Sequence, residues 1–298
     1  MSTRPPPRSR RLPSIALVGP GAVGRTLGRL LRRAGFPLIV AGRRPASTRA
    51  GARWIGAPCV TDPVEAARRS DWVLLTVPDD AIGRVARAMA AAGAFRPGQC
   101  VLHTSGLHTA ELLATARRAG AAVASLHPLH SFARPEASVR SFRGTACAIE
   151  GDPRAAAAAR RLARAAGGRP VAVDPTRKAL YHAGAVVACN DLVALFGAGI
   201  RLLRAAGIGR RDAERGLLGL VEGTVENLRR VGCPRALTGP VARGDTGTVR
   251  AHLRALARHA PDLLPAYRAA GRLAVRTARE KGTLGRGPAR ALRTLLRP

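Results

Sequence analysis

With 298 residues, the chain is longer than one typical domain and can bury a sizeable core, so two domains are expected. Its formal net charge of +32 would suggest a nucleic acid or an acidic membrane as a partner, but all except two of its 50 basic residues are arginines, spread over nearly every predicted helix. Because aromatic residues make up only 3% of the chain, we interpret the charge as a compositional bias and expect no specific nucleic-acid partner.

The cysteines and the apolar segments indicate the cellular compartment of the protein. There are five cysteines, an odd number, and none forms a C-x-x-C pair, which is typical of a reducing environment. We find no uninterrupted apolar run long enough to span a bilayer. We therefore expect a cytoplasmic protein with no membrane partner and no metal.

The first part of the chain predicts an arm and a Rossmann domain. Residues 1–11 combine three consecutive prolines with arginines and cannot bury apolar surface, so we expect a disordered arm. Over 12–174 short apolar runs alternate with helical patterns, which predicts an α/β, Rossmann-type, doubly wound and mostly parallel sheet. The expected strands are 15–18, 38–41, 58–61, 72–77, 100–104, 122–127, 145–149 and 170–173.

The second part, 175–298, predicts an all-helical domain. Strand patterns stop after Asp174-Pro175, where proline suits the first turn of a helix, and a long helical segment follows over 176–206. Residues after about 281 are rich in arginine, glycine and proline, so a frayed tail is expected.

A glycine turn, Gly19-Pro20-Gly21-Ala22-Val23-Gly24, joins the first predicted strand to an amphipathic helix. Gly19 permits a tight turn, Gly21 lets the backbone approach a pyrophosphate, and Gly24 lets the helix pack on the strand. The pyrophosphate would bind the helix N-terminus, with Ala22 and Val23 beside it. A purely structural turn is the alternative.

The end of the second strand favours NADP over NAD. An NAD site would have an acidic residue here for the ribose 2′-hydroxyl, whereas this chain has Arg43 and Arg44, which suit a 2′-phosphate. Chance placement is the alternative, since arginine is abundant. By fold analogy, Val77, Pro78 and Asp79 at the end of the fourth strand should border the adenine ribose or the nicotinamide of the cofactor.

Several segments together resemble a family of oxidoreductases with a Rossmann-like N-terminal domain and a helical C-terminal domain of unknown function. They are 19–24, 102–106, 125–129, Tyr181-His182 with Cys189-Asn190, and 237–245. More distantly, the chain is similar to pyrroline-5-carboxylate reductase, ketopantoate reductase, prephenate dehydrogenase and β-hydroxyacid dehydrogenases. The resemblance implies hydride transfer with NAD(P).

Two residues at strand ends are candidates for this chemistry. His127 is our preferred proton donor, because histidine titrates near neutral pH and the resembling dehydrogenases have an active-site histidine at such a strand end. Ser105 ends the neighbouring strand and could hydrogen-bond the substrate oxygen. A core histidine and a simple turn before Gly106 are the alternatives.

Three more candidates follow on the first long helix. Lys178 and His182 are four residues apart and share a face, and Asn190 lies two turns further on. The resembling β-hydroxyacid dehydrogenases have Lys and Asn at that spacing, so the match is partial. Asn190 instead resembles the helical asparagine of 3-hydroxyacyl-CoA dehydrogenases. An interhelical hydrogen bond and a solvated lysine are the alternatives.

The segment 237–245 breaks the helical pattern and brings Arg243 and Asp245 into one loop. Arg243 could bind a substrate carboxylate, or the two residues could pair and stabilise the loop. The resemblance implies that the helical domain, 175–298, binds the substrate and forms a homodimer.

The sequence thus predicts an NADP-dependent oxidoreductase acting on a small carbonyl, imine or hydroxy acid. An NADP-binding sensor without turnover is the alternative.

Overall fold

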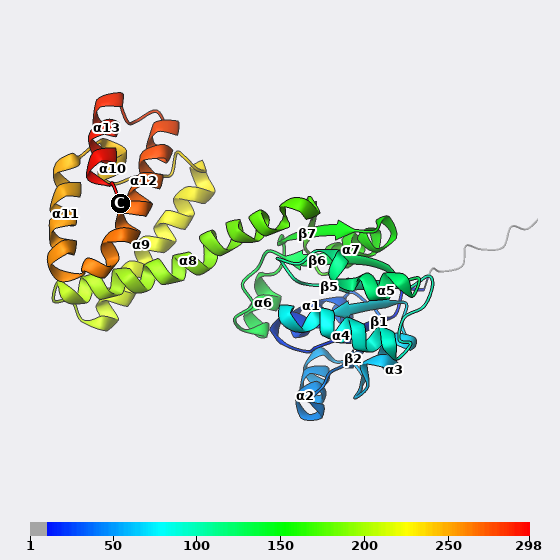
Figure 1. Cartoon of the computed structure of the whole chain (residues 1–298). Coiled ribbons are helices and arrows are strands. Elements are labelled where there is room, and N and C mark those ends of the chain that lie inside the picture. Colours follow the sequence, from blue (N-terminus) through cyan, green and yellow to red (C-terminus); the bar gives the residue numbers. More distant parts are fainter. Residues whose placement is uncertain (1–10) are drawn as a thin grey trace, which may run out of the picture. The chain divides into compact units, whose positions relative to one another are not determined.

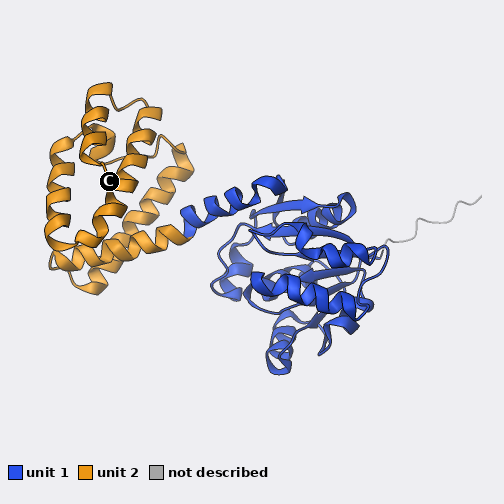
Figure 2. Ribbon diagram, in the orientation of Figure 1, with its two compact units in different colours: residues 1–189 blue, residues 190–298 orange. Residues whose placement is uncertain are grey.

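The computed structural model describes residues 11–298 and contains two compact units (Figure 1). The first unit ends at Cys189 and the second is Asn190–Pro298 (Figure 2). The expected disordered arm, apart from its last residue, lies outside the described residues. The expected domain boundary between residues 174 and 175 stays a prediction.

The first unit is built on an eight-stranded sheet. Its strands are β1 (Ile15–Val18), β2 (Leu38–Ala41), β3 (Cys59–Val60), β4 (Trp72–Leu75), β5 (Cys100–His103), β6 (Ala122–Pro128), β7 (Ala146–Gly151) and β8 (Arg169–Ala172). They lie in the order β3-β2-β1-β4-β5-β6-β7-β8, and every neighbouring pair is parallel except β6 with β7. The predicted fold class is confirmed. The apolar runs in the sequence predicted the strands well, because the strands of a parallel sheet are buried on both faces.

Helices cover both faces of this sheet. They are α1 (Ala22–Arg33), α2 (Pro45–Ile55), α3 (Pro63–Arg68), α4 (Asp79–Ala91), α5 (Ala114–Arg118), α6 (Pro135–Ser141) and α7 (Pro153–Ala165), with 3₁₀ turns η1 (Ala110–Leu113) and η2 (Pro175–Arg177). In β1, Ile15 and Leu17 pack into one apolar cluster with α1, α2 and α7. Ala16 and Val18 pack into the other with α3, α4 and α5. The carboxyl ends of the parallel strands are left as the edge where loops can build a site.

The second unit is all-helical in the described chain, as predicted. The helices are α8 (Lys178–Ala205), which begins in the first unit, α9 (Arg210–Val231), α10 (Pro240–Arg243), α11 (Thr246–His259), α12 (Leu264–Glu280) and α13 (Arg286–Leu295), with a 3₁₀ turn η3 (Pro261–Leu263). The expectation of a frayed tail after 281 was wrong. Leu292 and Leu296 are fully buried in a cluster with Val249 and Val275, because α13 is amphipathic despite its arginines.

Helix α8 also corrects the sequence analysis. The segment Pro175–Ala205 is long and apolar enough to cross a bilayer by length and composition, with a mean hydropathy of 1.7, and none of its most apolar window is buried. The sequence shows no uninterrupted apolar run here, because Asn190 and Asp191 interrupt it. Asp191 is nevertheless the only charged residue between Lys178 and Arg201.

Candidate functional site

The turn after β1 is shaped by close contacts on one side and is open on the other. Gly19 has a φ of +98°, and a Cβ there would lie 2.7 Å from Val77 Cγ1. A Cβ on Gly24 would collide with Gly19 O and with Thr76 Oγ1. Thr76 Oγ1 donates a hydrogen bond to Gly19 O at 2.6 Å. A Cβ on Gly21 would meet no atom within 4 Å, so the backbone is free to approach a ligand there.

The N-terminus of α1 fits an anion. No side chain caps this helix and its first turn contains no acidic residue. The first backbone N–H groups of a helix have no intrahelical partner, and the helix dipole makes this end positive. A pyrophosphate placed at Gly21, Ala22 and Val23 would therefore find donors and no repelling charge.

Arg43 and Arg44 lie beside this turn at the same edge of the sheet. Strand β2 pairs with β1 so that Ala41 is opposite Val18, and Gly19 N donates to Ala41 O at 2.9 Å. Both arginines are exposed, and neither forms an ion pair with any residue from 11 onwards. With no acidic residue at the end of β2, this corner suits a phosphate better than a ribose hydroxyl.

A cleft of about 430 Å³ runs from the glycine turn to His127 within the first unit. It is lined by Gly21, Ala22, Val23, Thr76, Val77, Pro78, Asp79, Thr104, Gly106, His127, Pro128, His130, Phe132 and His182. These residues come from the ends of β1, β4, β5 and β6 and from the start of α8. The structure thus brings together the glycine turn, Val77, Pro78, His127 and His182.

His127 is held in an uncharged state at the far end of the cleft. Its Nδ1 is 2.8 Å from the Tyr181 hydroxyl, and the two rings meet edge to face at 5.6 Å. Burial lowers the pKa of His127 to about 4, and His182 and Lys178 act in the same direction. A Cβ on Gly106 would lie 2.8 Å from His127 Nε2, so the ring sits directly against that backbone.

Ser105 does not line the cleft. Its buried hydroxyl donates to Asp79 Oδ2 at 2.5 Å and accepts from Leu107 N and His108 N at 3.2 and 3.0 Å. The hydroxyl is therefore fully used in shaping the turn and in holding Asp79, which does line the cleft. Fully buried His103 supports the same turn by accepting from Ser105 N.

Lys178 is buried and does not line the cleft. It is 1% exposed, and its Nζ donates to Glu150 Oε1 at 2.8 Å and to Ser125 Oγ at 2.5 Å. Burial lowers the pKa of Lys178, opposed by Glu150. Since Lys178 is enclosed, its observed contacts anchor the start of α8 to β6 and β7 and do not reach a ligand.

The remaining candidates are not among the described residues that line this cleft. Asn190 is exposed on α8. Arg243 is exposed at the end of α10, and no ion pair within the described chain joins it to Asp245. Asp245 caps α11, accepting from Thr248 N at 2.9 Å and from Thr248 Oγ1 at 2.6 Å.

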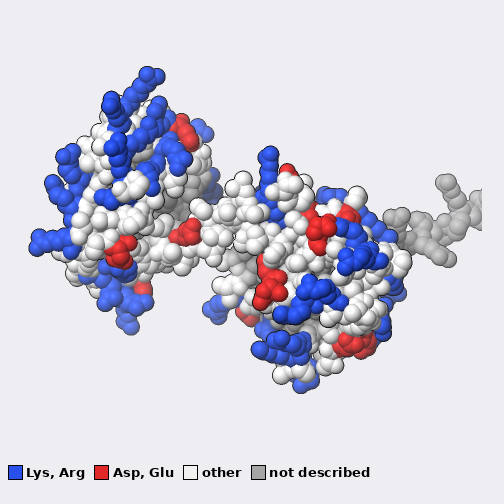
Figure 3. Space-filling view, viewed as in Figure 1, with Lys and Arg blue, Asp and Glu red and all other residues white. Residues whose placement is uncertain are grey.

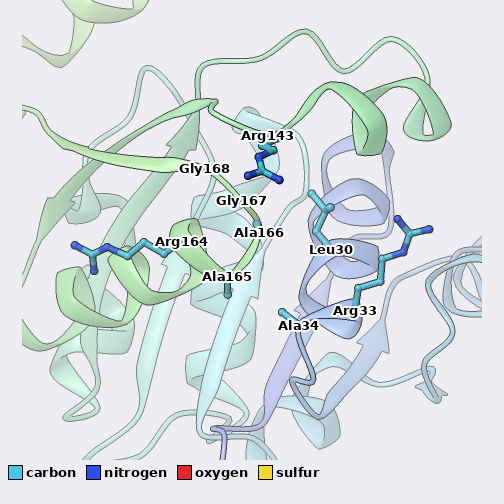
Figure 4. Close-up of a pocket in the computed structure, with 9 residues that line it drawn as sticks. All are labelled: Leu30, Arg33, Ala34, Arg143, Arg164, Ala165, Ala166, Gly167 and Gly168. Atoms are coloured by element: carbon cyan, nitrogen blue, oxygen red, sulfur yellow. The ribbon is translucent and has the colours of Figure 1, made fainter.

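A larger hollow, of about 570 Å³, lies elsewhere on the first unit and is less suited to a ligand (Figure 4). Arg33, Arg143 and Arg164 lie around it, but Figure 4 shows Arg33 and Arg164 pointing away from one another. On the face seen in Figure 3, Lys and Arg are likewise scattered over both units, with Asp and Glu between them. Charge alone therefore does not mark a site.

Sequence reasoning missed Thr76 and Tyr181. Thr76 directly precedes the predicted segment Val77-Pro78-Asp79, and the position of that segment at a strand end was the available signal. Tyr181 was noted only as part of a resembling segment. Its hydrogen bond joins residues 54 positions apart, which no local pattern shows.

Two family models match the chain. A Rossmann-like domain matches residues 4–128, and a domain of unknown function, DUF2520, matches residues 145–274. The chain therefore contains a Rossmann-like domain followed by a domain of unknown function. No curated protein matches it.

Solved structures share the fold over nearly the whole chain. Protein TM1727 from Thermotoga maritima is 23% identical with a TM-score of 0.72, covering 90% of this chain and 99% of its own. A 1-pyrroline-5-carboxylate reductase from Streptococcus pyogenes is 16% identical with a TM-score of 0.63, covering 92% and 100%. A Plasmodium falciparum pyrroline carboxylate reductase with NADP bound is 11% identical with a TM-score of 0.57, covering 96% and 99%. At these identities the likeness establishes the fold.

Proposed function

We propose that the protein is an NADP-dependent oxidoreductase that transfers a hydride between NADP(H) and a small carbonyl, imine or hydroxy-acid substrate. The observation that carries this proposal is the continuous cleft, which starts at the open glycine turn and ends at His127. The neighbours that are reductases, one with NADP bound, support it.

The residues present fit the cofactor. Gly21, Ala22 and Val23 would hold the pyrophosphate at the N-terminus of α1, and Arg43 and Arg44 would hold the 2′-phosphate. The adjoining residues Val77 and Pro78 would border the nicotinamide half. When bound, NADPH supplies the hydride that reduces a carbon atom.

His127 would then meet the oxygen or nitrogen next to that carbon. Since the pKa of His127 is about 4, the ring is neutral at pH 7 and acts as a hydrogen-bond partner rather than as an imidazolium acid. His182, whose ring lies 6.0 Å from that of His127, would border the same group. Of the other candidates, Ser105 and Lys178 would position this part of the cleft, and Asn190 and Arg243 remain proposals for substrate contacts.

Titration of the purified protein with NADPH and NADH, followed by the fluorescence of the nicotinamide, tests the cofactor. We expect saturable binding of NADPH and about 10- to 100-fold weaker binding of NADH, because charged hydrogen bonds contribute about 1.5–3 kcal/mol. Arg43→Ala should remove most of this preference, whereas Arg69→Ala, which removes an exposed arginine paired with Glu65, should not. Absence of saturable NADPH binding would refute the proposal.

A sensor that binds NADP without turnover is the second candidate, favoured by the neutral state of His127. Oxidation of NADPH in the presence of metabolite fractions separates the two. Turnover that His127→Ala abolishes supports the enzyme. Turnover unchanged in that variant would show that His127 has no part in the chemistry.

We also propose that the protein is a cytoplasmic homodimer assembled through the helical unit. Large apolar side chains are exposed on α8 and α9, including Val193 at 70%, Leu195 at 51%, Leu218 at 52% and Leu220 at 66%. With 28 residues, α8 is about 42 Å long. A helix of this length can supply much of the surface of about 800 Å² that each partner buries in a typical interface. We propose a second copy of this chain as the partner. Two chains of charge +32 repel each other, and this repulsion is weakest at the nearly uncharged segment of α8 between Lys178 and Arg201.

A further inference from the structure

Among the residues that the structure describes, Tyr181 is the one whose side chain forms a hydrogen bond with Nδ1 of the His127 ring. The hydroxyl lies 2.8 Å from Nδ1, within the range of a good hydrogen bond, and the edge-to-face packing holds both rings in place. No other described residue hydrogen-bonds the Tyr181 hydroxyl. The direction of this one bond therefore decides where the imidazole carries its proton.

A phenol is a better donor than a neutral imidazole N–H, and an imidazole nitrogen is a better acceptor than a phenol oxygen. Tyr181 therefore donates and Nδ1 accepts. A neutral imidazole carries one proton, so the proton lies on Nε2. Nε2 lies next to Gly106, and both His127 and Gly106 line the cleft.

We propose that Tyr181 is a positioning residue, which fixes His127 as the Nε2–H tautomer so that the cleft presents a hydrogen-bond donor to the reacting group. It follows that this group is an acceptor: a carbonyl oxygen or an unprotonated imine nitrogen. This inference rests on the proposed oxidoreductase function and narrows its substrate class.

The same pair explains how a neutral histidine can give up a proton. As the N–H bond at Nε2 breaks and an O–H or N–H bond forms on the substrate, Nδ1 takes the proton of the Tyr181 hydroxyl. The ring never becomes an anion, and the negative charge rests on the Tyr181 oxygen until solvent water restores the proton. Burial raises the pKa of Tyr181 to about 12, so the hydroxyl is fully protonated at neutral pH before this step.

The chain contains a matched control. His252 and Tyr267 in the helical unit repeat the arrangement, with the hydroxyl 2.8 Å from Nδ1 and the rings edge to face at 5.9 Å. They do not line the cleft. A change at Tyr267 should therefore affect His252 alone.

The test is ¹⁵N NMR at pH 7 on the full chain labelled at histidine, with the signals of His127 assigned by their loss in His127→Asn. We expect a protonated Nε2 and an unprotonated Nδ1 in the wild type. In Tyr181→Phe, loss of a hydrogen bond of about 0.5–1.5 kcal/mol should raise the ratio of the Nδ1–H to the Nε2–H tautomer by about 2- to 12-fold. Tyr267→Phe should leave the His127 signals unchanged.

A proton on Nδ1 in the wild type, or a tautomer ratio that Tyr181→Phe leaves unchanged, would overturn the inference. Reading the wild-type tautomer requires only that the assignment variant His127→Asn folds, and it does not depend on Tyr181→Phe. NADPH titration of the same samples is independent of the tautomer. Failure of that titration would count against the proposed function, whereas intact NADPH binding with the wrong tautomer would count against Tyr181 alone.

Discussion

His103 is a buried histidine whose role is to hold the turn that shapes the cleft. It is 0% exposed; its Nε2 lies 3.0 Å from Thr109 O, and its Nδ1 accepts from Ser105 N at 3.1 Å. Both contacts need a neutral ring that carries its proton on Nε2. Burial lowers its pKa from 6.5 to about 4, with Lys178 acting in the same direction.

This shift predicts a pH dependence of stability. Since the folded-state pKa of His103 is below the unfolded value, its contribution is complete above about pH 6.5 and is lost as the pH falls toward 4. At about 1.36 kcal/mol per pKa unit, the loss is about 3 kcal/mol. We expect His103→Gln to remove this part of the slope in urea unfolding between pH 6.5 and 4, and the slopes of the two proteins to coincide above pH 7. Equal slopes below pH 6.5 would contradict the assignment.

At the scale of elements, strands were easy to predict and the last helix was not. The strands β1 and β4 are continuous apolar runs, as expected for strands buried on both faces. In α13 the buried residues are Ala289 and Leu292, and the neighbouring Arg290 and Arg293 hide the helical spacing in a chain that is rich in arginine. In the site, likewise, features that are contiguous in the sequence were predicted and contacts between distant segments were not. The glycine turn is contiguous, whereas the contacts of Lys178 with Glu150 and of Tyr181 with His127 form only when distant segments meet.

The burial of α13 predicts that it stabilises the helical unit. Leu292 is 0% exposed, and a Cβ on Gly271 would lie 2.8 Å from Leu296, so α12 and α13 pack closely. Leu292→Ala should lower the free energy of unfolding of this unit by about 2–5 kcal/mol, because it leaves a cavity. Leu273→Ala, at a side chain that is 54% exposed, should cost less than about 1 kcal/mol. Urea unfolding followed by circular dichroism measures both, and equal losses would mean that α13 does not support the core.

At the scale of the whole molecule, exposed apolar side chains indicate a partner better than the net charge does. A charge of +32 alone would suggest an anionic polymer, but the arginines are spread over the chain, whereas exposed large apolar side chains are concentrated on α8 and α9. Fifteen large apolar side chains are exposed in the described chain, and ten of them lie on these two helices, which are Leu180, Val187, Leu192, Val193, Leu195, Leu218, Leu220, Val225, Leu228 and Val231. This concentration of exposed apolar side chains supports the proposed interface.

The homodimer proposal is tested by sedimentation. We expect the wild-type chain to sediment as a dimer and Val193→Glu to weaken the dimer at least tenfold, because a carboxylate replaces an apolar contact of more than about 1.4 kcal/mol. Leu273→Glu, on α12, adds the same charge at an exposed apolar residue outside α8 and α9 and should leave the dimer intact. A monomeric wild type would contradict the proposal. If that monomer also bound phosphatidylcholine vesicles, α8 would be a membrane segment. If the monomer did not bind vesicles, the exposed apolar side chains of α8 and α9 would be the binding surface for a different protein.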